Sequence, residues 1–311
     1  MKDALVGYTG FVGSNIVTKH HFTRCFYSRD IADSYGMKPD LLVYSGVPAE
    51  MFLANNHPEK DLAVIQNAMR NIEKIAPKRV VLISTIAVYD HPYRVDEDAD
   101  IDETKLSAYG KNRRLLEKFV QQTYADHLIV RLPALFGSGL KKNFIYDLIH
   151  IIPAMLTDEK YAELISRDDL LSDYYTELDN GFWKCRPIDR HEQAILKDYF
   201  KRAGFSALNF TDSRSVYQYY NLAYLWEHIE KALTLGIKLF NTATEPIATA
   251  ELYEAIYGQS FANCIRDVPF MYDYRTKHAD AFGGHKDYLF DRKQVLADIK
   301  TFINLEVSKW L

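Results

Sequence analysis

The sequence predicts a doubly wound α/β protein, in which a parallel sheet carries helices on both faces and a smaller, discontinuous C-terminal region is attached. Two observations predict this fold. An apolar strand at 4–6 leads directly into a glycine-rich turn and a helix, and short apolar runs then alternate with helical apolar spacing as far as residue 132. Strands that alternate with helices form parallel sheets through right-handed crossovers. The length of 311 residues, with 48% hydrophobic residues, is sufficient for a large core.

The turn after the first strand has the spacing Gly7-x-x-Gly10-x-x-Gly13. Gly7 allows a tight turn, Gly10 lets backbone N–H groups approach a pyrophosphate, and Gly13 lets the helix pack closely against the strand. The helix N-terminus directs partial positive charge towards the phosphates. These features predict a Rossmann-type dinucleotide site, although the spacing differs from the common G-x-G-x-x-G, and a glycine turn without a ligand is the alternative. The residues expected to contact the cofactor here are Gly7, Thr9, Gly10, Phe11, Val12 and Gly13.

The next strand, 24–27, is followed by Ser28, Arg29 and Asp30, where the adenosine ribose of a dinucleotide lies. An acidic residue there binds the ribose hydroxyls of NAD, whereas an arginine accommodates the 2′-phosphate of NADP. The chain offers both, so the expected cofactor is NADP or NAD. Ser28 and Arg29 come first and favour NADP, but a solvated loop charge is an equally good interpretation of Arg29 taken alone.

Five further elements complete the predicted sheet. The strand 40–46 ends in Ser45 and Gly46, at the carboxyl edge where such sheets bind ligands. A helix over 60–75 has apolar residues at helical spacing. The remaining elements are a strand at 79–83 that runs into Ser84 and Thr85, a helix at 107–124 and a strand at 127–132.

The pattern is weaker past Gly137. We expect helices and loops over 138–205 with 170–190 unassigned, strands at 207–211 and 238–241, and helices at 219–235, 249–257 and 291–303. The expected domains are an NAD(P)-binding domain, formed by 1–140 together with about 206–245, and a substrate-binding region, formed by 141–205 and 246–311.

The composition excludes several classes of function. A net charge of −4 gives no basis for nucleic acid binding. The cysteines Cys25, Cys185 and Cys264 lack metal or disulfide spacing and the histidines are dispersed, so we expect no metal site and a reducing, cytoplasmic location. We expect neither a signal peptide nor a membrane helix, because no apolar run reaches the ~18 residues that such a helix needs.

Three motifs stand in a characteristic order: the glycine turn 7–13, then STIAVY at 84–89, then YGKNR at 109–113. Together they resemble the extended short-chain dehydrogenase/reductases, and most of all the NAD-dependent epimerase/dehydratase group that acts on nucleotide sugars. The segments 131–137, 214–222 and 240–246 are also similar to that family. The resemblance therefore covers most of the chain and is thinnest between 145 and 205.

This resemblance implies hydride transfer between NAD(P) and a carbinol or ketone of a nucleotide sugar, in a homodimer. The implied catalytic residues are Thr85, Tyr109 and Arg113, the last at the position of the family's lysine. Further cofactor contacts are implied for Ser45, Gly46, Tyr109, Arg113 and Pro133. The implied substrate contacts are Thr85, Asn143 and Arg214.

The chemistry of these side chains fits an acid/base role for Tyr109. A tyrosine with a pKa near ~10 is a poor base at neutral pH, and a neighbouring cation lowers that pKa. Arg113 keeps the positive charge but has a different donor geometry from lysine. Dehydratases of the family have an acidic pair after the threonine, whereas Ile86 and Ala87 stand here. Dehydration is therefore not expected, and epimerisation or reduction of a 4-keto sugar remains.

Two departures favour a second hypothesis, a non-catalytic NAD(P)-binding sensor or scaffold. Arg113 replaces the family's lysine, and Ala134 replaces a usual asparagine. Asn143 has two equal interpretations, a substrate contact or plain loop packing. Arg214 also has two, an ion pair with Asp212 or a grip on a substrate diphosphate through two parallel hydrogen bonds.

Overall fold

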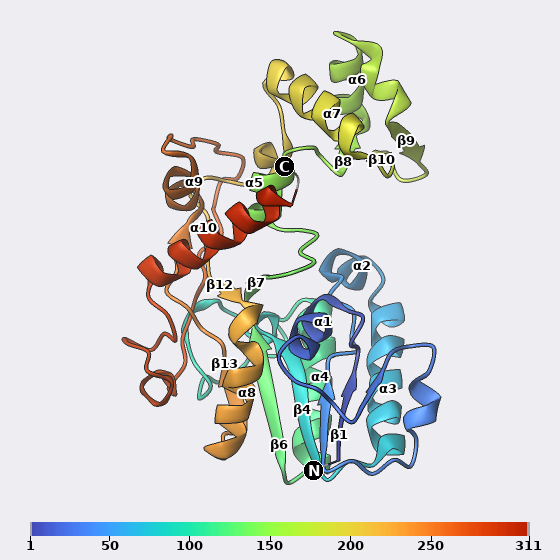
Figure 1. Ribbon diagram of the computed structural model, residues 1–311, viewed down its shortest axis with the longest axis vertical. Coiled ribbons are helices and arrows are strands. Elements are labelled where there is room, and N and C mark those ends of the chain that lie inside the picture. The colour runs from blue at the N-terminus through green and yellow to red at the C-terminus, as the bar shows by residue number, and fades with distance from the viewer. Residues whose placement is uncertain (1, 310–311) are drawn as a thin grey trace. The chain divides into compact units, whose positions relative to one another are not determined.

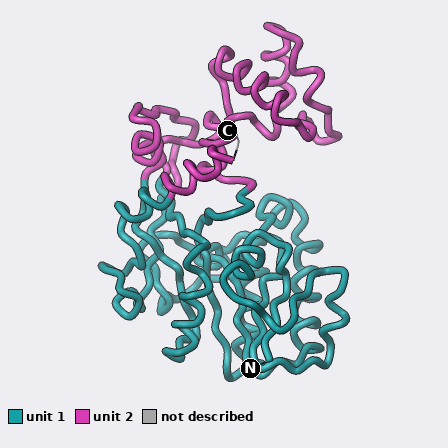
Figure 2. Tube along the Cα trace, in the orientation of Figure 1, with its two compact units in different colours: residues 1–140, 216–247, 271–298 teal, residues 141–215, 248–270, 299–311 magenta. Residues whose placement is uncertain are grey.

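A computed structural model of the chain describes residues 2–309. The chain divides into two compact units (Figure 2). Unit 1 consists of residues 1–140, 216–247 and 271–298, and unit 2 consists of residues 141–215, 248–270 and 299–311. Each unit is therefore built from three separate stretches of the chain.

Unit 1 contains a six-stranded sheet in the order β13-β6-β4-β3-β1-β2, with every pair parallel. The chain moves outward from β1 in both directions, and this reversal leaves a crevice at the carboxyl ends of β1 and β3. The predicted doubly wound fold is confirmed. The strands are β1 (Asp3–Val6), β2 (Arg24–Phe26), β3 (Leu41–Tyr44), β4 (Arg79–Thr85), β6 (His127–Leu132) and β13 (Leu239–Asn241).

Helices cover both faces of this sheet (Figure 1). On one face, α1 (Phe11–Val17) and α8 (Leu225–Thr234) bury Ile16 and Ile229 against the strands. On the other face, α3 (Pro58–Ile75) and α4 (Ala108–Thr123) bury an apolar stripe. The stripe consists of Ile65, Ala68, Ile72, Ile75, Leu116 and Val120. Each fully buried aliphatic side chain contributes roughly 1.5–3 kcal/mol, so these two layers hold the sheet in place.

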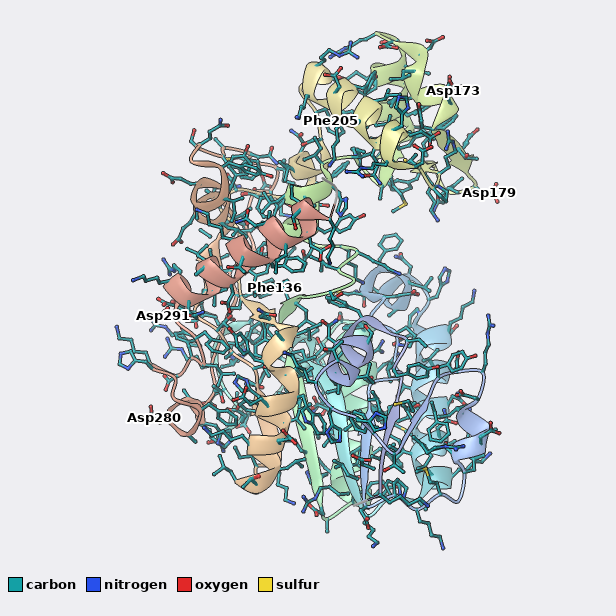
Figure 3. The ribbon with its side chains drawn as sticks, viewed as in Figure 1. Phe136, Asp173, Asp179, Phe205, Asp280 and Asp291 are labelled. Atoms are coloured by element: carbon teal, nitrogen blue, oxygen red, sulfur yellow. The ribbon has the colours of Figure 1, made fainter. Side chains whose placement is uncertain are left out.

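Shorter elements complete unit 1. The helix α2 (Met51–Asn56) follows β3. Two short parallel pairs join β7 (Ala134–Phe136) with β12 (Tyr219–Asn221), and β5 (Tyr93–Val95) with β15 (Asp273–Tyr274). Phe136, at the end of β7, is buried (Figure 3). The remaining short elements here are β11 (Val216–Tyr217), β14 (Ile247–Ala248), η1 (Ile31–Ser34), η2 (Ile86–Val88), η5 (Leu222–Tyr224) and η6 (Ala279–Phe282).

Unit 2 has a separate core around a three-stranded antiparallel sheet in the order β8-β10-β9. The Tyr161 and Trp183 rings stack there with their centroids 3.7 Å apart. The elements are α5 (Phe144–His150), β8 (Met155–Thr157), α6 (Asp158–Ile165), η3 (Asp169–Asp173), β9 (Tyr175–Leu178), β10 (Phe182–Cys185), α7 (Arg190–Ala203), η4 (Ala207–Phe210) and α9 (Thr249–Tyr257). The last helix, α10 (Arg292–Ser308), begins in unit 1 and ends in unit 2.

The structure corrects the sequence-based assignment at three places. Residues 207–210 form a 3-10 helix rather than a strand, capped by the Ser206 hydroxyl. The helix expected at 219–235 begins only at Leu225, because Tyr219–Asn221 pairs with β7 as a strand. Residues 271–298, expected in the substrate-binding region, lie in unit 1, where β15 pairs with β5 and Leu289 packs in the core.

Candidate functional site

The glycine turn is packed so tightly that two of its glycines have no room for a side chain. Gly7 has a φ of +93°, and a Cβ on Gly13 would lie 2.2 Å from the Gly7 carbonyl oxygen. Gly10 differs, because a Cβ there would meet only that same oxygen, at 3.3 Å. Gly10 is the N-cap residue of α1 and has no side chain that could accept a hydrogen bond. It therefore leaves the first backbone N–H groups of the helix without a side-chain cap. The turn therefore fits a pyrophosphate at Gly10 and needs Gly7 and Gly13 for its own packing.

Backbone hydrogen bonds bring three strand ends together at this turn. The Gly7 N–H donates to the Phe26 carbonyl at 2.7 Å, and the Ser45 N–H donates to the Val6 carbonyl at 2.9 Å. The Ser45 hydroxyl donates to the same Val6 oxygen at 3.0 Å. The expected cofactor residues that follow β1 and β3 thus lie at one place on the sheet, whereas Pro133 lies between β6 and β7.

The residues after β2 differ in how their polar groups are used. The Asp30 carboxylate accepts the Tyr27 N–H at 2.7 Å and so closes a local turn. Ser28 and Arg29 are exposed. One carboxylate oxygen of Asp30 is therefore committed to the backbone, while the Arg29 guanidinium faces solvent.

Tyr109 and Thr85 are brought together by a close contact between α4 and the end of β4. A Cβ on Gly110 would lie 2.2 Å from the Ala87 carbonyl oxygen, so the helix can approach this segment only because residue 110 is glycine. The Thr85 hydroxyl accepts the Ala87 N–H at 3.2 Å. Tyr109 is 5% exposed. Gly110 was not among the predicted site residues, although a glycine inside a helix was the available signal.

The surroundings of Tyr109 favour its protonated form. Burial raises the pKa of the Tyr109 phenol, and the Arg113 charge together with hydrogen bonding to Thr85 and Arg113 offsets that rise only in part. The Asp61 carboxylate raises the pKa further. The phenol therefore carries its proton at neutral pH, as a proton donor must.

Arg113 is held by groups of the protein itself. Its Nη1 donates to both carboxylate oxygens of Asp61, at 3.0 and 2.8 Å, and its Nη2 donates to the Pro48 carbonyl at 2.7 Å. The guanidinium carbon lies 4.2 Å from the centroid of the Tyr109 ring. We expected this side chain to be available for cofactor ribose hydroxyls, and the structure shows its Nη groups engaged elsewhere. Sequence reasoning missed Asp61, which belongs to no motif and reads as an ordinary acidic residue in the first turn of a helix.

A second ion pair fixes α4 to the sheet. The Glu117 carboxylate accepts from the Arg131 guanidinium at 2.9 and 2.6 Å and from the Ser84 hydroxyl at 2.6 Å. The Glu117 and Arg131 side chains are fully buried. This pair lies one helical turn beyond Arg113 and ties α4 to β4 and β6.

Two predicted substrate residues belong to unit 2. The Asn143 side chain caps α5 by accepting the Tyr146 N–H at 3.2 Å. Arg214 donates to Asp212 through Nε and Nη2, at 3.0 and 2.8 Å, and through Nη2 to the Arg266 carbonyl. Of the two interpretations of Arg214, the ion pair with Asp212 is present, while 43% of the Arg214 side chain remains exposed. The structure therefore brings Thr85, Tyr109 and Arg113 together in unit 1, and places Asn143 and Arg214 in unit 2.

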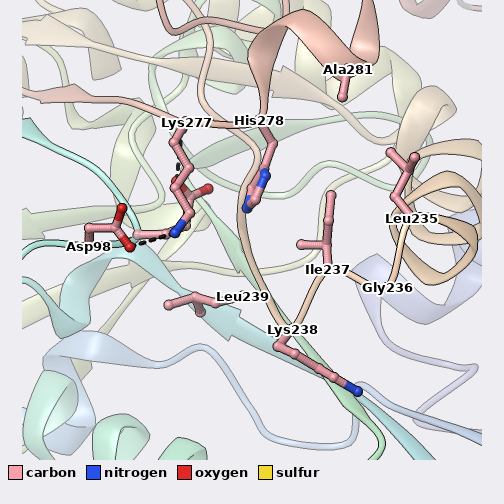
Figure 4. Close-up of a pocket in the computed structure, with 10 residues that line it drawn as sticks. Asp98, Leu235, Gly236, Ile237, Lys238, Leu239, Lys277, His278 and Ala281 are labelled. Atoms are coloured by element: carbon pink, nitrogen blue, oxygen red, sulfur yellow. Dashed lines mark hydrogen bonds and ion pairs between the residues drawn. The ribbon is translucent and has the colours of Figure 1, made fainter.

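A pocket of about 570 Å³ in unit 1 contains none of the predicted site residues. It is lined by charged groups that are paired with one another, such as Lys277 and Asp98 at 2.5 Å (Figure 4). Across residues 2–309, no helix is long and apolar enough to cross a membrane. Within the same residues, histidine, cysteine and acidic side chains form no group that could hold a metal ion.

Comparison with known proteins places this geometry in context. The sequence profile of the RmlD substrate binding domain matches residues 28–155. None of the curated protein sequences matches the chain significantly.

Solved structures match over nearly the whole chain. A dTDP-4-dehydrorhamnose reductase from Bacillus anthracis, in complex with NADP, is 13% identical with a TM-score of 0.61, and the match covers 97% of this chain and 98% of that one. The Bordetella bronchiseptica enzyme WbmG, in complex with NAD and UDP, is 13% identical with a TM-score of 0.61, covering 98% and 94%. A UDP-glucose 4-epimerase from Thermotoga maritima, with UDP-glucose, is 13% identical with a TM-score of 0.57, covering 100% of both chains.

At these identities the similarity to solved structures shows the fold, and the profile match lies over β3, β4 and α4, where the STIAVY and YGKNR motifs stand. The fold, the order of the motifs and the profile match over residues 28–155 all agree with the resemblance to the extended short-chain dehydrogenase/reductases.

Proposed function

We propose that the protein is an NADP-dependent reductase that acts on a keto group of a nucleotide-activated sugar. The observation that carries this proposal is the buried Tyr109 hydroxyl beside Thr85, in surroundings that keep it protonated. A protonated phenol suits reduction, which ends with proton donation to the substrate oxygen. Epimerisation would first require that phenol to act as a base.

The glycine turn supports the cofactor part of the proposal. Gly7, Gly10 and Gly13 leave an open backbone face at Gly10, where a pyrophosphate would lie, and Ser45 and Gly46 border it. When bound, NADPH would supply the hydride. The chain's own residues then have two tasks. Thr85 holds the substrate carbonyl oxygen, and Tyr109 gives it the phenolic proton, so that hydride and proton together convert the ketone to an alcohol.

The segment after β2 supports NADP over NAD. Arg29 is exposed, and a 2′-phosphate is a partner that a guanidinium binds through two parallel hydrogen bonds. The Asp30 carboxylate, which would serve the ribose hydroxyls of NAD, accepts a backbone N–H. Solved relatives bind either cofactor, so these two residues carry the preference.

The substrate part rests on Arg214 and on the relatives. WbmG was solved with UDP, and the Thermotoga epimerase with UDP-glucose. Both ligands contain a nucleoside diphosphate. Arg214 keeps an exposed part of its guanidinium that suits such a diphosphate. We also expect a homodimer, which sedimentation equilibrium of the purified protein would test.

One observation favours the second hypothesis, a non-catalytic sensor or scaffold. The family's lysine is replaced by Arg113, whose Nη groups are bound to Asp61 and Pro48. A protein of that kind would bind NADPH without turning over any keto sugar.

Turnover separates the two hypotheses. We expect NADPH oxidation with dTDP- or UDP-linked 4-keto sugars, and a loss of at least about 100-fold in Tyr109→Phe with NADPH affinity unchanged, because only the proton donor is removed. Full activity in Tyr109→Phe would place the proton donor elsewhere. NADPH binding without turnover of any such sugar would support the sensor.

Calorimetry with NADPH tests the cofactor site independently of turnover. We expect Gly10→Val to abolish binding and keep the melting temperature, because its side chain enters the open face of the turn. Gly13→Val is the matched contrast, and should lower the melting temperature because its Cβ meets the Gly7 carbonyl oxygen. Unchanged NADPH affinity in Gly10→Val would contradict the assignment.

A further inference from the structure

Asp61 is a carboxylate of α3 that is built into the surroundings of Tyr109. Its side chain is 11% exposed. Besides the two hydrogen bonds from Arg113, its Oδ2 accepts the Asn112 side-chain amide at 2.9 Å. The same amide donates to the Pro58 carbonyl at 3.3 Å, which ties the first turn of α4 to the first turn of α3. Asp61 is therefore fixed in position by two adjacent residues of α4.

Asp61 helps to hold the Arg113 guanidinium in one orientation. Asp61 and the Pro48 carbonyl take the Nη1 and Nη2 donors, and the guanidinium plane is left against the ring of Tyr109. A cation over a ring face is attracted to the ring itself. The positive charge is thus partly compensated by a carboxylate and lies over the ring, so it lowers the Tyr109 pKa without overcoming the effect of burial. A lysine at this position would end in a single ammonium that cannot bind Asp61 and Pro48 through a fork.

Two charged side chains act on the Tyr109 hydroxyl from different elements. Arg113 comes from its own helix, and Asp61 comes from α3. The end of β4 contributes the neutral Thr85, and α2 contributes Asn55, which accepts the Tyr109 backbone N–H at 3.0 Å. After burial, the Arg113 charge is the largest influence on the Tyr109 pKa, and the Asp61 charge opposes it.

We propose that Asp61 is a positioning residue of the reductase: it holds the Arg113 guanidinium against the ring of Tyr109, so that the hydroxyl keeps its proton until a substrate oxygen takes it. This inference rests on the proposed function for its catalytic meaning, but the electrostatic role can be measured without cofactor or substrate. It also gives a reason for the replacement of the family's lysine, since an arginine fork can bind Asp61 and Pro48 at once.

The direct test is the ultraviolet titration of tyrosinate in the purified protein. The chain has 22 tyrosines, so each variant is compared with the same variant carrying Tyr109→Phe, and the difference reports Tyr109 alone. In Asp61→Asn we expect the Tyr109 midpoint to fall by about one pH unit, a tenfold change in proton affinity, because the Arg113 charge is no longer compensated. Asp61→Glu, which keeps the carboxylate, should leave the midpoint close to that of the unaltered protein.

A matched control removes a carboxylate that pairs with α4 elsewhere. Glu103 binds Lys118 at 2.5 Å and Arg114 at 3.5 Å, so Glu103→Gln changes the charge by the same amount and should leave the Tyr109 midpoint unmoved. A lower melting temperature in Asp61→Asn with an unmoved midpoint would show a purely structural role and overturn the proposal. An equal shift in Glu103→Gln would overturn it as well, because the effect would be one of overall charge.

A second variant keeps the test decisive if Asp61→Asn alone is too unstable. Asp61→Asn combined with Arg113→Gln removes both charges and leaves no buried ion unpaired. The Asp61 carboxylate also raises the Tyr109 pKa directly, as the smallest of the named causes. If Asp61 acts mainly through Arg113, this double variant should therefore titrate Tyr109 only slightly below Arg113→Gln alone. If the Tyr109 midpoint differs between these two variants by as much as it does between Asp61→Asn and the unaltered protein, Asp61 acts on the hydroxyl directly and not by positioning Arg113. If the midpoints move as expected while no keto sugar is reduced, the positioning role stands and only the proposed function fails.

Discussion

Arg113 and Arg214 each bind an aspartate, but the two regions use the pair in different ways. In unit 1 the Arg113 and Asp61 side chains are 6% and 11% exposed, and the guanidinium is enclosed by Asp61, Pro48 and the Tyr109 ring. In unit 2 the Asp212 side chain is fully buried while 43% of Arg214 is in solvent. The first arginine is enclosed by groups of the protein, whereas the side chain of the second stays partly in solvent.

The carboxylates differ in the same way. Hydrogen bonds from the Arg214 side chain and from three backbone N–H groups hold the pKa of Asp212 well below its usual range. These N–H groups belong to Arg214, Ile265 and Arg266. Asp212 is therefore stable as a charged group through backbone contacts as well as through Arg214. Asp61 depends on the side chains of Arg113 and Asn112. The comparison predicts that replacing the arginine lowers the free energy of unfolding strongly in unit 1 and only slightly in unit 2.

The largest expected effect is that of Arg113→Ala on stability. Removing one partner of a buried pair leaves Asp61 uncompensated, which costs about 3–5 kcal/mol. Urea unfolding followed by circular dichroism measures this loss. Lys118→Ala is the control on the same helix, where an exposed pair with Glu103 is broken at a cost within about 1 kcal/mol. Equal losses in the two variants would show that burial does not distinguish these pairs.

The next largest effect is that of Arg214→Ala on nucleotide binding. We expect the affinity for UDP or dTDP to fall about 10–100-fold, since charge-assisted hydrogen bonds to a diphosphate are lost, while NADPH affinity is unchanged. Calorimetry of each ligand gives both constants. Arg202→Ala, which breaks the exposed pair with Asp198 in the same unit, should change neither. A lower melting temperature with unchanged UDP and dTDP affinity would assign Arg214 to structure, like Arg113.

The sequence was most informative where local signals agree with the tertiary fold. The helix α3 and the strand β4 have strong apolar patterns, and their predicted positions hold to within two residues. Gly7 was predicted to allow a tight turn and Gly13 to allow close packing of the helix; the φ of +93° at Gly7 and the 2.2 Å contact that a Cβ on Gly13 would make agree with both. The Thr85 and Tyr109 side chains are adjacent because their separation in sequence corresponds to one strand-to-helix crossover.

Sequence reasoning failed where structure depends on distant partners. The strands β8, β10 and β9 are short, and β10 pairs with both of the others inside a segment whose composition is mixed. Tyr219–Asn221 becomes a strand only because β7 is beside it, while its apolar spacing continues into the following helix. Asp61 lies 52 residues from Arg113, and no periodicity links them. Such contacts follow from the packing of α3 on α4, which the sequence predicts only as two separate helices.

The smallest expected effect extends the comparison to a third arginine, Arg29, which is exposed at the end of β2. If exposure marks the arginines that serve ligands, Arg29→Ala should weaken NADPH binding about tenfold and leave NADH binding unchanged, because only NADPH carries the 2′-phosphate. Fluorescence titration of each reduced cofactor measures the two constants. Arg24→Ala is the matched control, because Arg24 is also exposed but lies over the Phe26 ring. Equal losses for NADH and NADPH in Arg29→Ala would mean that Arg29 shapes the turn around Asp30 rather than reading the phosphate.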